Sequence, residues 1–302
     1  MTENLPKAQL NGDTKQASMG KFGLVLEGGG LRGVYTAGVL DLFLDKDFHA
    51  PYTVAVSAGA CQAYSYISKQ KGRSFRVTAD FIGDHRYLSY RSLILKGEIF
   101  GMDFVFDEVP RKLVPFDFEA FDASEQEFVI AATNCETGLV EYFNKSDKHD
   151  MLLVGRASSS LPLLSKMVKI DDKPYLDGGV VVPIPFEKAL EDGYSKNIVI
   201  LTQDSTYVRR HSQTVVYLMR VIYRKYPKLA EVYSKRAENY NKMVAHIVEQ
   251  EKEGNVFIIR PTKTVTVGRI EKNKEKLKTF YDEGYDDAER LWPKLKEWMS
   301  NL

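Results

Sequence analysis

A glycine-rich segment near the start of the chain has the composition of an anion-binding loop. Residues 28–33 read Gly-Gly-Gly-Leu-Arg-Gly; they follow the apolar run 22–27, which predicts a buried strand, and lead into residues 33–44, whose apolar positions have helical spacing. Glycines at such a turn let backbone N–H groups point into one space, and the helix N-terminus adds positive potential. The loop suits either the pyrophosphate of a dinucleotide or the oxyanion of a tetrahedral intermediate. A tight turn without a ligand is the plain alternative.

The dinucleotide interpretation meets only part of its sequence fingerprint. The pattern G-x-G-x-x-G is formed by Gly28, Gly30 and Gly33. The same fingerprint requires an acidic residue at the end of the next strand, where it binds the ribose hydroxyls. The next predicted strand, residues 52–56, is followed by a serine, and Asp45 and Asp47 precede that strand. Six residues of loop do not decide between the two chemistries.

That serine lies at a second predicted strand-to-helix turn. Residues 55–59 read Ala-Val-Ser-Ala-Gly, one residue away from the G-x-S-x-G motif that exposes a nucleophilic serine on a sharp turn. Ala55, Ala58 and Gly59 are the small neighbours that such a turn needs, and we expect the extra methyl group of Ala55 to be tolerated. Ser57 is therefore the candidate nucleophile. Its alternative role is to cap the helix that follows.

A nucleophilic serine needs a base, and the sequence offers an aspartate for this role. None of the five histidines lies in a recognisable motif. Asp177 follows an apolar stretch and precedes Gly178 and Gly179, which allow a tight turn that brings the carboxylate close to another main chain. Aspartate is a weak base at its reference pKa of about 3.9, so a Ser–Asp dyad requires a buried carboxylate. An Asx turn is the plain interpretation of Asp-Gly.

Together, the three motifs resemble the patatin-like phospholipase family, in its bacterial type. The resemblance covers about residues 22–203 and includes the segments 131–134 and 157–162. It implies a three-layer α/β/α fold with a mostly parallel central sheet and a C-terminal helical elaboration, with Ser57 as nucleophile and Asp177 as general base. It also implies an oxyanion loop made of Gly28, Gly29, Gly30, Leu31, Arg32 and Gly33. Within this loop, Gly29 and Gly30 are the expected donors, and Arg32 would support the loop electrostatically.

The reaction that the resemblance implies is hydrolysis of acyl esters in lipids, through an acyl-enzyme on Ser57 and without a metal or an organic cofactor. One alternative is an α/β-hydrolase triad in which His211 or His246 joins Ser57 and Asp177; it is disfavoured because the serine follows only two predicted strands. The others are a dinucleotide-binding protein and a catalytically silent lipid-binding module. We expect residues 72–125 and the C-terminal helices to form the acyl-chain pocket.

Composition excludes several broad classes of protein. The 302 residues are 44% hydrophobic and 27% charged, which is typical of a globular protein rather than a disordered or low-complexity chain. A formal net charge of +1 gives no global electrostatic reason to expect a nucleic-acid partner. No apolar run approaches the ~18 residues that a membrane span needs. Two cysteines form neither a disulfide framework nor a CxxC site, so we expect a cytoplasmic protein.

The pattern of predicted elements indicates one elaborated domain. Residues 1–20 are expected to be a disordered tail, 21–205 the catalytic domain, and 206–302 a helical extension packed on that domain. Residues 127–133 and 139–143 flank a turn and predict a hairpin, and residues 256–260 predict a strand that returns to the same sheet. The mixed segment 72–125 is expected to contain helices and loops.

The predicted helical region at residues 209–242 is strongly basic. It carries nine Lys or Arg against two Glu, interleaved with aliphatic and aromatic residues. A basic amphipathic helix can rest peripherally on an anionic membrane surface. We favour the plainer interpretation, a solvated basic face with the apolar side packed on the core. Membrane contact remains the second hypothesis.

Overall fold

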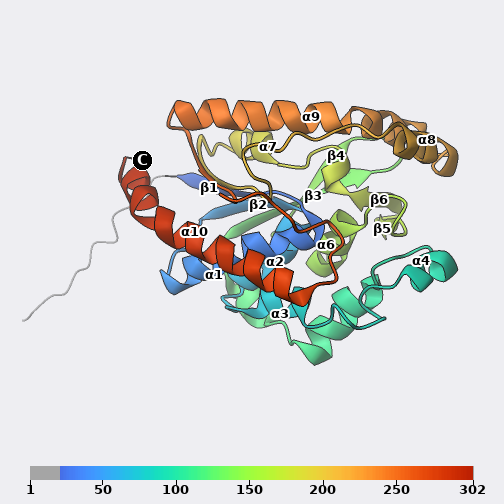
Figure 1. Ribbon diagram of the computed structural model, residues 1–302, viewed down its shortest axis with the longest axis horizontal. Helices are drawn as coiled ribbons and strands as arrows, with labels where there is room; N and C mark the ends of the chain where they lie inside the picture. Colours follow the sequence, from blue (N-terminus) through green and yellow to red (C-terminus); the bar gives the residue numbers. More distant parts are fainter. Residues whose placement is uncertain (1–20, 302) are drawn as a thin grey trace, which may run out of the picture.

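The structure, a computed structural model, describes residues 21–301; the predicted tail at 1–20 lies outside the described residues. Within that range, eight strands form one sheet in the order β5-β6-β3-β2-β1-β7-β8, with β4 paired to β3 (Figure 1). The parallel strands are β1 (Phe22–Leu26), β2 (Tyr52–Val56), β3 (Glu127–Asn134), β7 (Lys196–Ile200) and β8 (Val256–Ile259). The antiparallel strands are β4 (Val140–Asn144), β5 (Val168–Ile170) and β6 (Lys173–Asp177).

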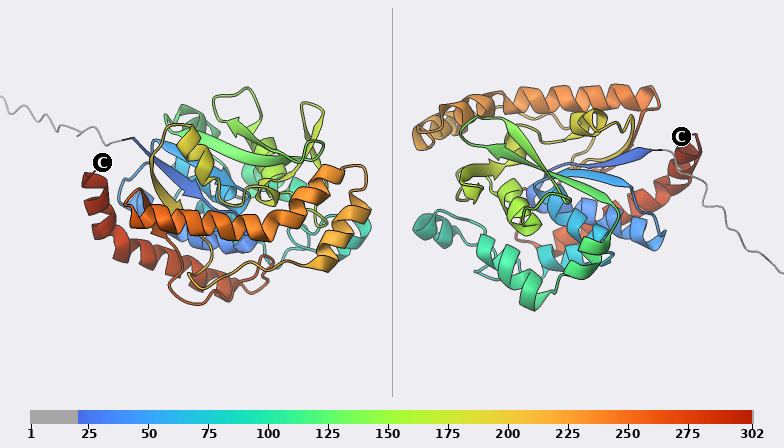
Figure 2. Two further views of the ribbon diagram at one scale, coloured as in Figure 1. Left: turned by 90° about the horizontal axis from the view of Figure 1, so that it is seen from above. Right: turned by 180° about the vertical axis from the view of Figure 1, so that it is seen from behind.

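Helices cover both faces of this sheet (Figures 1 and 2). One face carries α1 (Gly33–Asp45), α2 (Ala58–Ile67) and α10 (Lys274–Ser300), and the other carries α7 (Phe186–Glu191) and α9 (Pro227–Lys252). A hydrophobic core lies on each face of the sheet. Strand β1 contributes to both cores, because successive side chains of a strand point to opposite faces. Leu24 and Leu26 pack in the core on the α1 side, and Val25 packs with Tyr240 of α9. The expected three-layer α/β/α fold with a mostly parallel sheet is confirmed.

The continuous apolar runs of the sequence become strands that are buried on both faces. All five residues of β1 and of β2 are buried, as is usual for parallel strands between two helical layers. The predicted hairpin is also confirmed, because β4 pairs antiparallel with β3. Among the helices of residues 21–301, none combines the length and the apolar composition that a membrane-spanning helix needs.

Residues 72–125, for which the sequence predicted helices and loops without bounds, form short helices beside α2 and α6 (Met151–Ser159). They are α3 (Arg73–Ala79), α4 (Tyr90–Lys96), a π-helical segment η2 (Phe104–Leu113) and α5 (Phe118–Ala123). Pro110 lies inside η2, where a proline removes a backbone donor and breaks regular helical spacing. Because these helices are short and one of them contains a proline, the sequence shows no helical periodicity here.

The C-terminal part of the chain wraps around the sheet. It comprises α8 (Gln213–Ile222), α9, the edge strand β8 and α10. Helix α10 crosses α1 at very short range, because a Cβ atom at Gly284 would overlap the carbonyl oxygen of Tyr35, and one at Gly38 would overlap that of Tyr281. Tyr35 also donates a hydrogen bond of 3.1 Å to Asp287 of α10. These contacts tie the end of the chain to the helix that follows the glycine loop.

Candidate active site

Ser57 and Asp177 meet at the carboxyl ends of two strands that are not neighbours in the sequence. Ser57 follows β2, and Asp177 ends β6; both strands pair with β3, which lies between them. The Ser57 hydroxyl donates a hydrogen bond of 2.7 Å to Oδ2 of Asp177. Both residues are buried, with exposed fractions of 6% and 2%. The structure therefore brings the candidate nucleophile and the candidate base into direct contact.

The backbone at Ser57 has a strained turn conformation. Its φ of 53° and ψ of −124° lie where residues with a Cβ atom are rarely found. The Ser57 N–H donates to the hydroxyl of Ser158 at 2.8 Å, and that hydroxyl donates to the carbonyl oxygen of Ala131 at 2.7 Å. The Ser57 side chain makes no capping hydrogen bond to α2, so the interpretation of Ser57 as a side-chain cap is wrong. Ser158 is the residue that holds this turn, and it was not singled out from the sequence.

Small residues are required around the turn because two segments cross it closely. A Cβ atom at Gly59 would lie 2.7 Å from the carbonyl oxygen of Leu26 and 2.8 Å from that of Glu27. Ala58 faces Gly33 at the start of α1, where a Cβ would come within 2.8 Å of the Ala58 Cβ. Ala55 is fully buried within β2. The glycine loop and the serine turn therefore pack directly against each other.

Asp177 forms an Asx turn and the contact with Ser57 at the same time. Its Oδ1 accepts the N–H of Gly179 at 2.6 Å, which leaves Oδ2 for the serine. A Cβ atom at Gly178 would overlap the backbone of Ala131, so glycine is needed at that position. The Gly179 carbonyl oxygen accepts a hydrogen bond of 2.5 Å from Nε of Arg236. Asp177 can thus form an Asx turn and still contact Ser57, so the Asx-turn interpretation and the base interpretation of this residue are compatible.

Burial makes this carboxylate a stronger base. Removal from water raises the pKa of Asp177 above its ordinary value of 3.8, because the charged form loses its solvation. The hydrogen bond from Ser57 and the charge of Arg236 act in the opposite direction, and they are the smaller effects. This is the condition that a direct Ser–Asp dyad requires.

The glycine loop leaves two backbone donors next to Ser57. The N–H of Gly28 donates to the carbonyl oxygen of Pro183 at 3.1 Å, and that of Leu31 donates to the carbonyl oxygen of Arg269 at 3.0 Å. Within residues 21–301, no acceptor takes the N–H of Gly29 or Gly30. Both glycines line a small cavity together with Ser57 and Asp177. The loop can therefore hold an oxyanion with two donors.

The remaining residues of the loop have separate surroundings. Leu31 lines an apolar pocket beside the dyad. Arg32 is buried with Glu27 nearby, and burial lowers the pKa of its guanidinium while the Glu27 charge raises it. Glu27 in turn accepts the N–H of Thr202 at 2.6 Å. Arg32 is thus buried within the loop near the Glu27 carboxylate, and its role as an electrostatic support stays a prediction.

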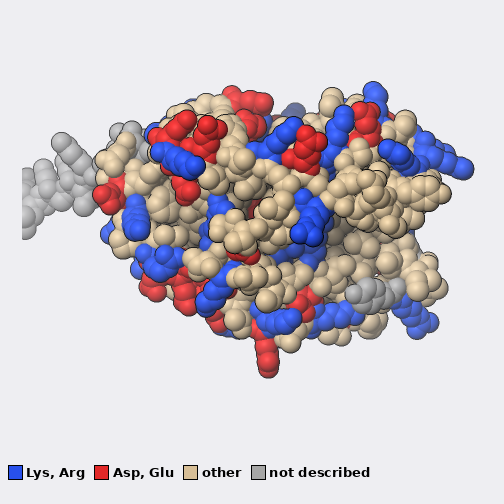
Figure 3. Space-filling model, turned by 45° about the horizontal axis from the view of Figure 1, so that its top comes forward, with Lys and Arg blue, Asp and Glu red and all other residues tan. Residues whose placement is uncertain are grey.

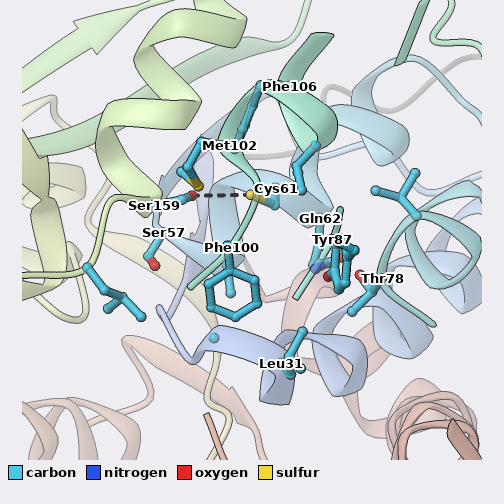
Figure 4. Close-up of a pocket in the computed structure, with 15 residues that line it drawn as sticks. Leu31, Ser57, Cys61, Gln62, Thr78, Tyr87, Phe100, Met102, Phe106 and Ser159 are labelled. Carbon is cyan, nitrogen blue, oxygen red and sulfur yellow. Dashed lines mark hydrogen bonds between the residues drawn. The ribbon is translucent and has the colours of Figure 1, made fainter. Parts of the chain in front are cut away.

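An apolar pocket opens on one side of Ser57 (Figure 4). Its lining comes from the glycine loop, from α2 and α3, and from the segments 100–106 and 159–161; the side chains drawn around it include Leu31, Cys61, Tyr87, Phe100, Met102 and Phe106. Residues of the segment 72–125 line this pocket, as expected, but no residue of the C-terminal helices does. Burial raises the pKa of the Cys61 thiol to about 11, so this cysteine stays neutral.

The histidines and acids of the alternative interpretations lie elsewhere. His246 is half-buried, and its Nδ1 lies 2.8 Å from Oε1 of Glu187. His211 is exposed at a neighbouring cavity, and within the described chain neither histidine bonds to Ser57 or Asp177. Asp45 lies at the far end of α1 from the glycine loop, where it pairs with Lys71. The geometry therefore favours neither the triad nor the dinucleotide site.

Comparison with known proteins gives two matches to family models along the chain. The model of the patatin-like phospholipase family matches residues 24–190. A second model, described as a domain of unknown function (DUF6363), matches residues 226–300.

Similar individual proteins are also found. The uncharacterized protein YjjU of Escherichia coli strain K12 is 31% identical over 192 residues, which cover 62% of this chain and 53% of that protein. The chain thus spans about half the length of this curated relative. The crystal structure of VipD from Legionella pneumophila has a TM-score of 0.48 and 11% identity, and the match covers 90% of this chain and 66% of that one.

The first family match spans more than half of the chain and contains the glycine loop, the serine turn and the Asp-Gly-Gly turn. The chain therefore belongs to the patatin-like phospholipase family.

Proposed function

We propose that this protein is a lipid acyl hydrolase in which Ser57 is the nucleophile and Asp177 the general base. The observation that carries the proposal is the hydrogen bond of 2.7 Å from the Ser57 hydroxyl to a buried carboxylate, at a strained turn. A hydroxyl held in this way has its proton acceptor in place before substrate binds. Membership of the family supports the same class of reaction.

In the first half of the proposed reaction, Ser57 Oγ attacks the ester carbonyl carbon while its proton moves to Oδ2 of Asp177. The carbonyl oxygen becomes an oxyanion, which the N–H groups of Gly29 and Gly30 bind. The N-terminus of α2, which starts at Ala58, adds positive potential at the same place. When the intermediate collapses, the bond to the alcohol oxygen breaks, and Asp177 returns its proton to the departing alkoxide.

In the second half, water hydrolyses the acyl-enzyme. The water attacks the acyl carbonyl carbon and gives a proton to Asp177, and the same two N–H groups bind the second oxyanion. Collapse of this intermediate releases the fatty acid, and the proton returns to Ser57 Oγ. Every proton transfer uses one carboxylate, so the step needs neither a histidine nor a metal ion.

The apolar pocket beside Ser57 supports a lipid as the acyl donor. It is lined by side chains such as Leu31, Phe100 and Met102, which offer an acyl chain a surface away from water. Each methylene group that enters such a pocket contributes about 0.8 kcal/mol. The acyl chain would therefore lie among the residues of Figure 4, with its carbonyl group at Ser57.

We also propose that α8 touches the lipid surface. In α9, the plainer interpretation of the basic segment holds, because residues such as Leu229 and Ile247 are buried against the core. Helix α8 differs, since large apolar side chains are exposed along it: Tyr217, Leu218, Val221 and Ile222. Ile94 and Leu95 of α4 are exposed at the same end of the molecule (Figure 1). Exposed apolar side chains that gather at one end of a lipid-binding protein are typical of peripheral membrane contact.

Charge supports this surface. Basic residues of α8 and the turn after it, Arg220, Arg224 and Lys225, are exposed next to the apolar side chains. The face of the molecule drawn in Figure 3 has a largely uncharged stretch at its right, with basic side chains at the margin of this stretch. Both cysteines are free thiols, which supports the cytoplasm as the compartment.

Substitution of either dyad residue tests the chemistry. Ser57→Ala should lower kcat for a soluble short-chain ester by about 10⁴-fold or more, and Asp177→Asn by about 10³-fold or more, because each removes a group of one catalytic unit. The double variant should be no slower than Ser57→Ala. Replacing His211 and His246 together with Gln should leave the rate within about threefold, since no step uses them. Wild-type turnover by Ser57→Ala would exclude the proposed nucleophile.

The raised pKa of Asp177 predicts a linked pH dependence of activity and stability. The carboxylate form is the base, so kcat/KM should rise with pH on an acid limb that lies above the ordinary aspartate value of 3.8. The folded state binds this proton more tightly than the unfolded state. The free energy of unfolding of the wild type, relative to Asp177→Asn, should therefore fall as pH rises from about 4 through the raised pKa. Parallel pH–rate profiles and urea titrations measure both, and an acid limb below pH ~4 would contradict the assignment.

Filling the apolar pocket should change chain-length preference. Cys61 lies one helical turn after Ser57 and lines the pocket, so Cys61→Phe removes room for several methylene groups. For a dodecanoyl ester we expect kcat/KM to fall by about 100-fold, since four lost methylenes are worth about 3 kcal/mol. The acetyl ester and the control Cys61→Ala should stay within about threefold of wild type. Equal losses for both esters would place the acyl chain elsewhere.

Vesicle binding tests the role of α8. The double variant Val221→Ser, Ile222→Ser should bind about tenfold more weakly to vesicles of equal parts phosphatidylcholine and phosphatidylglycerol, because two apolar side chains no longer enter the interface. Leu113→Ser is the matched control: that leucine is also exposed, on η2, whose end contacts α3. Added salt should weaken wild-type binding. Unchanged binding by the double variant would show that α8 is not the contact.

A further inference from the structure

A cavity lined in part by arginines adjoins the small cavity that contains the dyad. It encloses about 300 Å³, and its lining includes three arginines, Arg209, Arg236 and Arg269. Arg236 and Arg269 also line the small cavity that contains Ser57 and Asp177. The small cavity at the dyad therefore shares lining residues with the apolar pocket and with the basic cavity.

From this arrangement we infer that the basic cavity binds the phosphate group of an acyl-ester substrate, held by Arg209, Arg236 and Arg269. The inference rests on the proposed function, and it adds a substrate-binding site to it. The acyl chain would enter the apolar pocket, and the alcohol part with its phosphate would point to the arginines.

Arg209 gives the most direct support, because it is buried without a full set of partners. Its exposed fraction is 7%, and within the described chain its Nε and Nη1 atoms have no hydrogen-bond acceptor. The guanidinium lies 3.6 Å from the ring centroid of Tyr240, and its backbone is fixed by two hydrogen bonds with the Asn241 side chain. A buried charged donor without an acceptor is costly unless a ligand supplies one. Both nitrogens are themselves buried, so Arg209 adds a positive charge to the cavity wall, and these two atoms find no acceptor within the described chain.

The charge around the cavity is not balanced by protein carboxylates. The ion pairs that arginines make within residues 21–301 involve Arg76, Arg86, Arg111, Arg156 and Arg290, and none of the three cavity arginines. Burial, and then the charges of Arg269 and Arg209, lower the pKa of Arg236, because each of these two charges disfavours the charged form of Arg236. The charge of Asp177 offsets only part of this repulsion. A bound anion would relieve it.

The chemistry of the donors selects phosphate over other anions that an ester could carry. A guanidinium is planar and donates two parallel hydrogen bonds, a geometry that phosphate oxygens match. Three guanidinium groups around one cavity suit a group with several equivalent acceptor oxygens and a charge of one or two. The order of compartments also fits a glycerol ester, in which the acyl chain, the ester group and the phosphate follow one another along the molecule.

All three arginines lie outside the segment matched by the patatin-like family model. Arg209 precedes α8, Arg236 is on α9, and Arg269 lies in the loop before α10, while the family match ends at residue 190. Arg236 and Arg269 fall within the match to the domain of unknown function, residues 226–300. The inference therefore gives this C-terminal region a task, which is to supply the basic half of the substrate site.

Two soluble substrates with the same acyl chains test the site. Dihexanoyl glycerophosphate carries the phosphate, and dihexanoylglycerol lacks it. Wild type should have the higher kcat/KM for the first, and Arg269→Gln and Arg209→Gln should each lower that value by about tenfold to 100-fold, mainly through KM. The neutral substrate should change by less than about threefold. Arg76→Gln, at an exposed arginine of α3, removes the same charge and should change neither value.

Binding of inorganic phosphate provides a readout that does not depend on turnover. Titration calorimetry with Ser57→Ala should detect phosphate binding that Arg269→Gln in the same background loses. If phosphate binds in this way but wild type does not prefer the phosphate-bearing ester, the cavity takes free phosphate and the substrate assignment is overturned. Equal losses on both esters, or no phosphate binding, would overturn the site itself. Binding without hydrolysis of either ester would contradict the proposed function and leave the phosphate site standing.

Discussion

The hydrogen bond between Ser57 and the buried carboxylate of Asp177 is the interaction on which the rest of the site depends. It can form only if the ends of β2 and β6 are held one strand apart, and β3 provides that spacing by pairing with both. The strained backbone of Ser57 and the burial of Asp177 are both unfavourable in isolation. They persist because the sheet and the Ser158 hydroxyl fix the surrounding backbone.

The N-terminal and C-terminal parts of the chain line different sides of the space around this hydrogen bond. The glycine loop, α2 and the segment 100–106 line the apolar side, whereas Arg236 and Arg269 bring charge from the C-terminal region. Arg236 also binds the Gly179 carbonyl oxygen, and the Arg269 carbonyl oxygen accepts the N–H of Leu31. The C-terminal region is thus joined to the Asp-Gly-Gly turn and to the glycine loop, and α10 anchors it to α1.

Much of the fold follows from local patterns, because strands buried on both faces give continuous apolar runs and glycine turns mark their ends. The sequence marked Ser57 and Asp177 at glycine-containing turns after such runs, and the family resemblance implied that the two residues act together; their catalytic roles stay predictions. Contacts between segments that are distant in the sequence could not be predicted from local patterns. Ser158 is one of three consecutive serines at a helix end, and only its place behind β2 distinguishes it. Arg209 belongs to a basic run that is typical of a solvated face, yet it is buried on Tyr240, 31 residues later. The π-helical turn at Pro110 broke the periodicity of the segment that lines the apolar pocket.

Labelling with a fluorophosphonate probe, followed by intact-mass measurement and peptide mapping, tests the central claim most directly. The probe reacts covalently with a serine only where the hydroxyl is activated and the site is open. The account predicts one adduct, on Ser57, that forms in wild type and is lost or strongly slowed in Asp177→Asn, while a His211→Gln, His246→Gln variant labels like wild type. An adduct on another residue, or labelling of Ser57 that does not depend on Asp177, would contradict the dyad.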